Sequence, residues 1–118
     1  DTGCHPDVQY KPEKRWGNLS KIITSIGTSN DNLILNLKKN KITPTDIDLV
    51  INSHLHPDHC GCNQFFTNAE FICSSDELKI ARSVDAESKG YIIKEWQHPM
   101  PLKEIKKNYD IFDHSTLC

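Results

Sequence analysis

The chain has 118 residues, a length at which one domain with a modest core is expected. Its 14 basic and 16 acidic residues give a formal charge of −2, so the surface as a whole does not attract nucleic acid. The longest apolar runs have about three residues, far too few to span a membrane. We therefore expect neither nucleic acid nor a membrane as a partner.

The five cysteines are an odd number and lack the regular spacing of a disulfide framework. This favours reduced thiols and hence the cytoplasm. The chain begins at Asp1 without an initiator Met or an apolar leader, so we expect the true N-terminus, with any targeting signal, to lie upstream.

The first part of the chain predicts little regular structure. Residues 1–3 (DTG) predict a turn, and residues 4–17, with two prolines and no periodicity, predict a loop. Apolar residues recur at helical spacing over residues 19–26 and predict a short amphipathic helix that ends at Gly27.

The next segment carries clearer signals. Residues 29–31 (SND) are all N-cap types, residues 33–37 have apolar positions at helical spacing, and lysines follow, so a helix is predicted there. Thr43 before Pro44 predicts a capped turn, and residues 49–51 (LVI) predict a buried strand.

A second strand and helix are predicted further along. Residues 70–73 (EFIC) favour a strand, and Ser74 with Glu77 has the spacing of a capping box. Leu78 and Ala81 then share one face of the predicted helix.

The C-terminal part is more ambiguous. Residues 90–101 favour a strand at their start and a loop at their end, and residues 109–118 predict a hairpin with its turn at residues 113–115. The alternation of short strands and helices predicts a mixed α/β layer structure.

Four side chains able to bind a divalent metal fall within six residues, directly after the strand predicted over residues 49–51. They are His54, His56, Asp58 and His59. Two imidazoles can share one metal while the carboxylate and the third imidazole hold another, roughly 3.5–4 Å away. A bridging water then has a pKa near roughly 7, which makes hydroxide available at neutral pH. The alternative, a solvated polar turn, gives no reason for this density of ligands.

Residues 51–63 (INSHLHPDHCGCN) resemble the signature of the metallo-β-lactamase superfamily. Residues 52–56 and residues 66–68 (FTN) are most similar to its N-acyl homoserine lactonase branch. Residues 1–3 (DTG) resemble the sequence that ends an early strand in that family, and residues 47–50 (IDLV) fit the strand that precedes the motif.

The resemblance implies an αββα sandwich with a dinuclear zinc site, of which this chain is the first half only. Residues 1–118 are then a partial metallo-β-lactamase domain that lacks the first strands and the C-terminal half. The implied activity is hydrolysis of a lactone or ester by metal-activated hydroxide, and with it quorum quenching. Other divalent metals are also compatible. Because the family's remaining ligands lie downstream, we expect the 118 residues alone to be inactive.

The resemblance also implies roles for individual residues. His54 and His56 bind the first metal, and Asp58 and His59 bind the second. Asp58 is also the catalytic residue that passes a proton towards the leaving oxygen. Asp1 orients the loop that carries these four residues by hydrogen bonds.

Substrate contacts are less defined. Tyr10 and Trp16 could line an apolar acyl pocket, as in similar enzymes, or could anchor the loop that carries them. The family usually has an aromatic or small residue where Pro57 stands and a Gly-Gly pair at residues 61–62, so the pocket wall differs here.

Other candidate ligands are not assigned. His98 lies in a predicted loop, directly before Pro99, and His114 lies in the predicted hairpin. The spacing of Cys60 and Cys62 differs from that of zinc knuckles and thioredoxin-like motifs, so small buried cysteines packed behind the motif are the preferred interpretation.

Two alternative functions remain open, and two others are disfavoured. A glyoxalase II-like thioesterase has the same His/Asp pattern. The diiron branch of the superfamily normally has Glu where His56 stands, and the acidic balance disfavours its phosphodiesterases and nucleases. The chain as it stands could instead be a non-catalytic metal-binding fragment. The sequence does not predict an oligomeric state.

Overall fold

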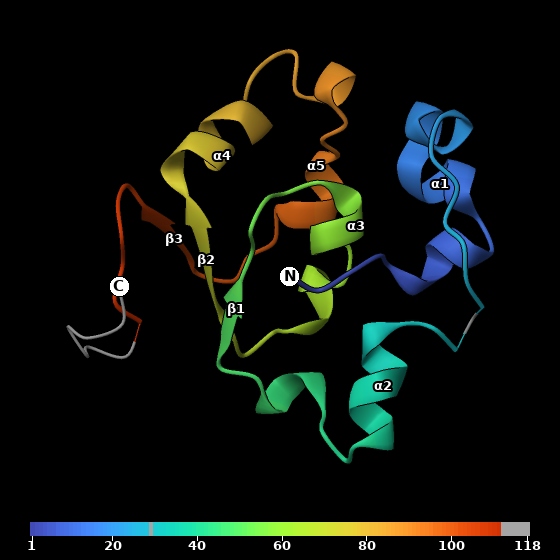
Figure 1. The fold of residues 1–118 in the computed structure, drawn as a ribbon, viewed down its shortest axis with the longest axis horizontal. Coiled ribbons are helices and arrows are strands. Elements are labelled where there is room, and N and C mark those ends of the chain that lie inside the picture. Colours follow the sequence, from blue (N-terminus) through green and yellow to red (C-terminus); the bar gives the residue numbers. More distant parts are fainter. Residues whose placement is uncertain (29, 112–118) are drawn as a thin grey trace.

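The computed structural model describes residues 1–28 and 30–111, arranged around a small sheet (Figure 1). Three parallel strands lie in the order β1-β2-β3. Their bounds are Leu49–Ile51, Glu70–Ser74 and Leu102–Ile105. The first two strands were predicted and are confirmed, whereas β3 was not predicted.

Helical crossovers connect the strands, because parallel strands cannot be joined by a tight turn. α3 (Pro57–Cys60) lies between β1 and β2, and α4 (Ser75–Ala81) and α5 (Ile93–Trp96) lie between β2 and β3. The carboxyl ends of the strands therefore meet at one edge of the sheet, the edge at which ligands bind in open α/β sheets. Short 3₁₀ turns at Asn63–Phe65 and Glu87–Lys89 lie in these crossovers, and others at Pro6–Gln9, Gly17–Lys21 and Pro44–Asp46 precede β1.

The predicted helix before β1 is confirmed as α2 (Leu33–Lys39). Its N-cap is Asn32, one residue beyond the predicted cap positions, and the Asn32 side chain accepts a hydrogen bond from Leu35 N at 3.0 Å. The predicted turn after Thr43 is also confirmed, with a capping box between Thr43 and Asp46. α2 packs its apolar residues beside the second core cluster described below.

The loop predicted over residues 4–17 is wrong. A 3₁₀ turn and the helix α1 (Pro12–Trp16) form there, each with a proline at its first position. Proline suits that position because its fixed φ matches a helix and its missing N–H has no partner there. Burial of Trp16, which is 4% exposed, stabilises the short helix.

The amphipathic helix predicted over residues 19–26 is also wrong. Only the 3₁₀ turn ending at Lys21 forms. Ile22 is 82% exposed and Ile26 is 96% exposed. A helix this short is marginal without tertiary packing of its apolar face, so periodicity alone did not produce it.

The ambiguous stretch over residues 90–101 contains α5, followed by an irregular segment that leads into β3. Trp96 and Glu95 of α5 are buried. Most of the hairpin predicted over residues 109–118 lies outside the described residues, and residues 109–111 form no strand.

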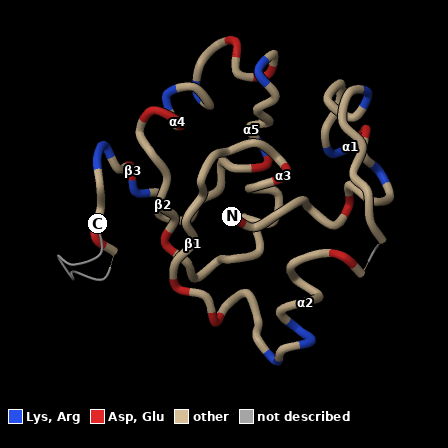
Figure 2. Tube along the Cα trace, viewed as in Figure 1, with Lys and Arg blue, Asp and Glu red and all other residues tan. Residues whose placement is uncertain are grey.

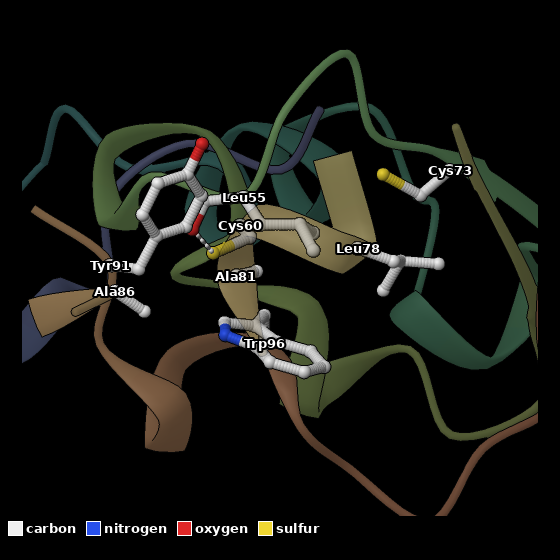
Figure 3. Close-up of a cluster of buried hydrophobic side chains, with 8 residues drawn as sticks. All are labelled: Leu55, Cys60, Cys73, Leu78, Ala81, Ala86, Tyr91 and Trp96. Carbon is white, nitrogen blue, oxygen red and sulfur yellow. Dashed lines mark hydrogen bonds between the residues drawn. The ribbon is translucent and has the colours of Figure 1, made fainter. Parts of the chain in front are cut away.

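Two clusters of buried side chains make the core. The first lies between α4, α5 and the loop that follows β1 (Figure 3). It contains Leu55, Cys60, Cys73, Leu78, Ala81, Ala86, Tyr91 and Trp96. The second packs α2 against the sheet and contains Val50, Cys62, Phe66, Ala69 and Phe71. The result is the mixed α/β layer structure that the sequence predicts.

A buried ion pair joins α1 to α5. Arg15 Nε lies 2.5 Å from Glu95 Oε1, and Glu95 is fully buried. Arg15 also donates to Gln64 Oε1 at 2.9 Å. The N-terminal helix is thereby fixed to the body of the protein.

Charged residues of both signs are distributed around the outside of the described chain (Figure 2). Lys and Arg occur on α1, at the end of α2, and on α4 and β3. No helix in the described part of the chain is long and apolar enough to cross a membrane.

Candidate metal centre

The motif loop, which we define as residues 52–59, begins where β1 ends at the carboxyl edge of the sheet. His56 has an extended backbone (φ −69°, ψ 150°), and Pro57 follows at the first position of α3. Asp58 and His59 therefore lie within the four residues of α3, just beyond the extended segment that carries His54 and His56.

The loop brings three of the four predicted ligands together. Single ligand atoms of His54, Asp58 and His59 all lie within 4.8 Å of one another. The ring centroids of His54 and His59 are 3.8 Å apart. His56 is not part of this three-residue group, but its ring lies edge-on to His54 with centroids 5.0 Å apart.

Asp1 contacts the motif loop at several points. Its Oδ1 accepts from Ser53 N at 2.7 Å, and its Oδ2 accepts from Ser53 Oγ at 2.7 Å. Oδ2 also lies 3.0 Å from His59 Nδ1. These hydrogen bonds span more than 50 residues of sequence and are suited to the orienting role predicted for Asp1.

The hydrogen bonds determine which nitrogen of each imidazole can bind a metal. Because a carboxylate only accepts, Nδ1 of His59 carries the proton and Nε2 keeps a lone pair, 3.4 Å from Asp58 Oδ2. Ser53 donates its hydroxyl proton to Asp1, so its oxygen accepts from His54 Nδ1 at 3.1 Å and leaves His54 Nε2 free. Burial, followed by the neighbouring His59 and His56, lowers the pKa of His54 and favours its neutral form. This donor set fits a divalent metal.

A buried polar network behind the loop was not predicted. Thr2 Oγ1 donates to Asn63 Oδ1 at 2.8 Å, and Asn63 Nδ2 donates to Asn52 Oδ1 at 2.9 Å. Thr2 N also donates to His59 O at 2.7 Å. Thr2 is distant from Asn52 and Asn63 in the sequence, so no local pattern predicts the network.

The cysteines beside α3 are core residues, as predicted. Cys60 and Cys62 are fully buried, and Cys60 Sγ donates to Leu55 O at 3.4 Å (Figure 3). Burial raises the pKa of Cys62 to about 12, so this thiol stays protonated at neutral pH. Gly61 between them is tightly enclosed, since a Cβ there would lie 2.4 Å from His5 N.

The remaining candidates lie apart from the cluster. Trp16 is buried, whereas Tyr10 is 66% exposed and lines a surface cavity of about 340 Å³ with basic residues of α1. Lining of an acyl pocket by these residues stays a prediction. His98 Nε2 bonds to Glu95 O at 3.0 Å, and His114 lies outside the described residues.

Imidazoles and a carboxylate gathered at the carboxyl edge of a parallel sheet define an α/β protein with a candidate metal centre. The family model described as the Metallo-beta-lactamase superfamily matches residues 1–111, and the chain belongs to this superfamily. The fold is thus the predicted partial αββα sandwich.

Similar proteins include lactonases. The N-acyl homoserine lactonase AiiB of Rhizobium rhizogenes is 38% identical over 99 residues, which cover 80% of this chain and 36% of that protein. The N-acyl homoserine lactonase AttM of Azorhizobium caulinodans is 28% identical over 123 residues, which cover 99% of this chain and 47% of that protein. The chain thus spans less than half the length of these relatives.

A solved structure supports the same relationship. It is an N-acyl homoserine lactone hydrolase with the product N-hexanoyl-L-homoserine bound at its catalytic metal centre. It is 25% identical, with a TM-score of 0.77, and the match covers 96% of this chain and 44% of that chain.

Proposed function

We propose that the protein containing this chain is a metal-dependent hydrolase that opens the ring of a lactone, with N-acyl homoserine lactones as the substrate class. The observation that carries the proposal is the convergence of His54, Asp58 and His59 at the carboxyl end of β1 in a metallo-β-lactamase fold. The names of the similar proteins support the choice of substrate, and a role in quorum quenching would follow from it.

The proposed cofactor is zinc, with two ions in the complete site. His54 and His56 would hold one ion, and Asp58 and His59 the other. The short distance between the His54 and His59 rings supports two neighbouring ions. When bound, a divalent metal polarises a carbonyl oxygen and makes water a nucleophile at neutral pH.

The chain's own residues have separate tasks in this proposal. Asp58, whose side chain is 56% exposed, can reach substrate; it would accept the proton released by the attacking water and pass it to the leaving alkoxide oxygen. Asp1 would hold His59 through Nδ1 and keep the loop backbone in place through Ser53. Tyr10 and Trp16 remain the proposed contacts of the acyl chain.

Ring opening by the whole protein tests this function. We expect hydrolysis of an N-acyl homoserine lactone that is lost after treatment with a chelator and restored by zinc. His54→Ala should abolish it, whereas His98→Ala should leave it intact because His98 is outside the cluster. Ring opening no faster than in the metal-stripped protein would contradict the proposal. Cleavage of a glutathione thioester with inert lactones would instead support the glyoxalase II-like alternative.

We also propose that residues 1–118 alone are inactive and hold zinc loosely. The short length relative to the lactonases supports this. Metal analysis of the isolated segment beside the whole protein is the measurement, and two tightly held zinc ions in the segment would contradict it. The proposed compartment is the cytoplasm, supported by four free thiols among the described residues.

A further inference from the structure

The carboxylate of Glu77 forms a hydrogen bond outside its own helix, α4. Ser74 Oγ accepts from Glu77 N at 3.2 Å, which is half of the predicted capping box at the start of α4. The Glu77 side chain instead turns to the motif loop, where its Oε1 accepts from Leu55 N at 2.8 Å. Leu55 is the residue between His54 and His56, so Glu77 holds the backbone from which both imidazoles project.

Tyr91 extends this contact to the His56 ring. Its ring lies against His56 with centroids 4.5 Å apart, and its hydroxyl interacts with the Glu77 carboxylate. Burial, followed by the interaction with Glu77, raises the pKa of Tyr91 to about 12, so the hydroxyl stays protonated at neutral pH. The Glu77 carboxylate thus contacts both the backbone of Leu55 and Tyr91, whose ring packs on His56.

The segment before Tyr91 fixes the His56 tautomer. His56 Nε2 lies 3.0 Å from Lys89 O, and because a carbonyl only accepts, Nε2 carries the proton. Nδ1 of His56 is therefore the nitrogen with the free lone pair. Gly90 has φ +88°, and a Cβ there would lie 3.6 Å from His56 Nε2, so the chain passes close to the ring.

We propose that Glu77 and Tyr91 are positioning residues that, together with Lys89 O, set His56 as a metal ligand through Nδ1. The inference rests on the proposed metal centre. Metal ligands commonly depend on such outer partners, whose loss weakens metal binding. There are two alternatives to this role. Glu77 could only cap α4, or its charge could act on the imidazoles at long range.

Zinc affinity of the whole protein distinguishes these roles. It can be measured by competition with a chromophoric chelator, next to the visible spectrum of the Co²⁺-loaded protein. Glu77→Ala should weaken zinc binding about 10–100-fold and shift the Co²⁺ bands. Glu77→Gln should stay near the parent value, because its amide can accept from Leu55 N and donate to the Tyr91 oxygen. Tyr91→Phe keeps the ring on His56 but removes the hydroxyl that interacts with Glu77, so its loss of zinc affinity should be intermediate.

Two controls separate positioning from folding and from charge. Asp76→Asn removes an exposed carboxylate from the same turn of α4 and should leave zinc affinity unchanged. Leu78→Val alters a fully buried side chain of the same helix and should lower the unfolding temperature without changing zinc affinity.

The proposal is overturned if Glu77→Ala binds zinc like the parent, or if Leu78→Val weakens binding equally. It is also overturned if Glu77→Gln is as weak as Glu77→Ala, because charge would then be the cause. Failure of the proposed function appears differently, as a parent protein that binds zinc with the predicted dependence on Glu77 but opens no lactone.

Discussion

Asp1 Oδ2 lies 3.0 Å from Nδ1 of His59, so the first residue of the chain contacts a candidate ligand 58 residues away. The same carboxylate group accepts from the backbone and side chain of Ser53. One side chain therefore holds both ends of the motif loop.

Removing this carboxylate should weaken metal binding. We expect Asp1→Ala to lower the zinc affinity of the whole protein by about 10–100-fold, because His59 loses the partner that fixes its tautomer. Equilibrium dialysis against a zinc buffer measures the change. Asp7→Asn is the matched control, since that carboxylate is 67% exposed and lies outside the motif loop. An unchanged affinity in Asp1→Ala would show that the contact does not support the site.

The buried pair of Arg15 and Glu95 predicts a strong dependence of stability on both partners. Arg15→Met should destabilise the protein by about 3–5 kcal/mol, because it leaves a buried carboxylate without its counter-ion. Replacing both residues by Met should restore much of the loss, since apolar side chains of similar volume replace buried pairs well. Urea denaturation of the parent, both single variants and the double variant measures the coupling, and additive losses would contradict the prediction.

The same pair predicts a pH effect. Burial, opposed by Arg15, raises the pKa of Glu95 above its ordinary value of 4.5. The folded state then binds the proton more tightly than the unfolded state, so this group lowers stability as pH rises from the ordinary towards the raised pKa. The slope should be steeper in Arg15→Met, where the opposing charge is gone. Free energies of unfolding of the parent and of Glu95→Gln, measured between about pH 4 and pH 8, test this. The prediction is contradicted if the parent gains stability relative to Glu95→Gln as the pH rises.

Gly61 should not tolerate a side chain. A Cβ at this position would lie 2.4 Å from His5 N and 2.6 Å from Pro57 O, both backbone atoms that cannot move aside cheaply. We expect Gly61→Ala to destabilise the protein by about 3 kcal/mol or more. Gly17→Ala provides the comparison, because Gly17 has φ +56° and ψ −128° but open space around it, so backbone strain alone should cost about 1–3 kcal/mol. Equal losses in urea denaturation would show that the enclosure of Gly61 is not limiting.

The elements with complete local signals were predictable. β1 and β2 have runs of apolar and branched residues, and α2 and α4 have both helical periodicity and capping residues. α1, α5 and β3 have four or five residues each, and their formation depends on distant packing. Trp16 and Trp96, for example, become buried only when the N-terminal and C-terminal parts of the described chain come together.

The residues of the site also divide into those that a local sequence pattern predicts and those that depend on distant packing. The four candidate ligands are neighbours in sequence, so their chemistry could be recognised without a structure. Glu77 was interpreted as a capping residue, because its spacing from Ser74 is a complete local explanation. Its contact with Leu55 depends on how α4 packs on the motif loop, which no local pattern encodes.

The dependence of the motif loop on distant residues also affects the kinetics of folding. His54, His56, Asp58 and His59 leave the ribosome together, but their partners come from residues 58 positions earlier and 33 positions later. Contacts of such separation form late, because closing long loops costs chain entropy before the contacts compensate. Tight zinc uptake should therefore mark the end of folding of this region, and its rate during refolding reports when these distant segments have docked.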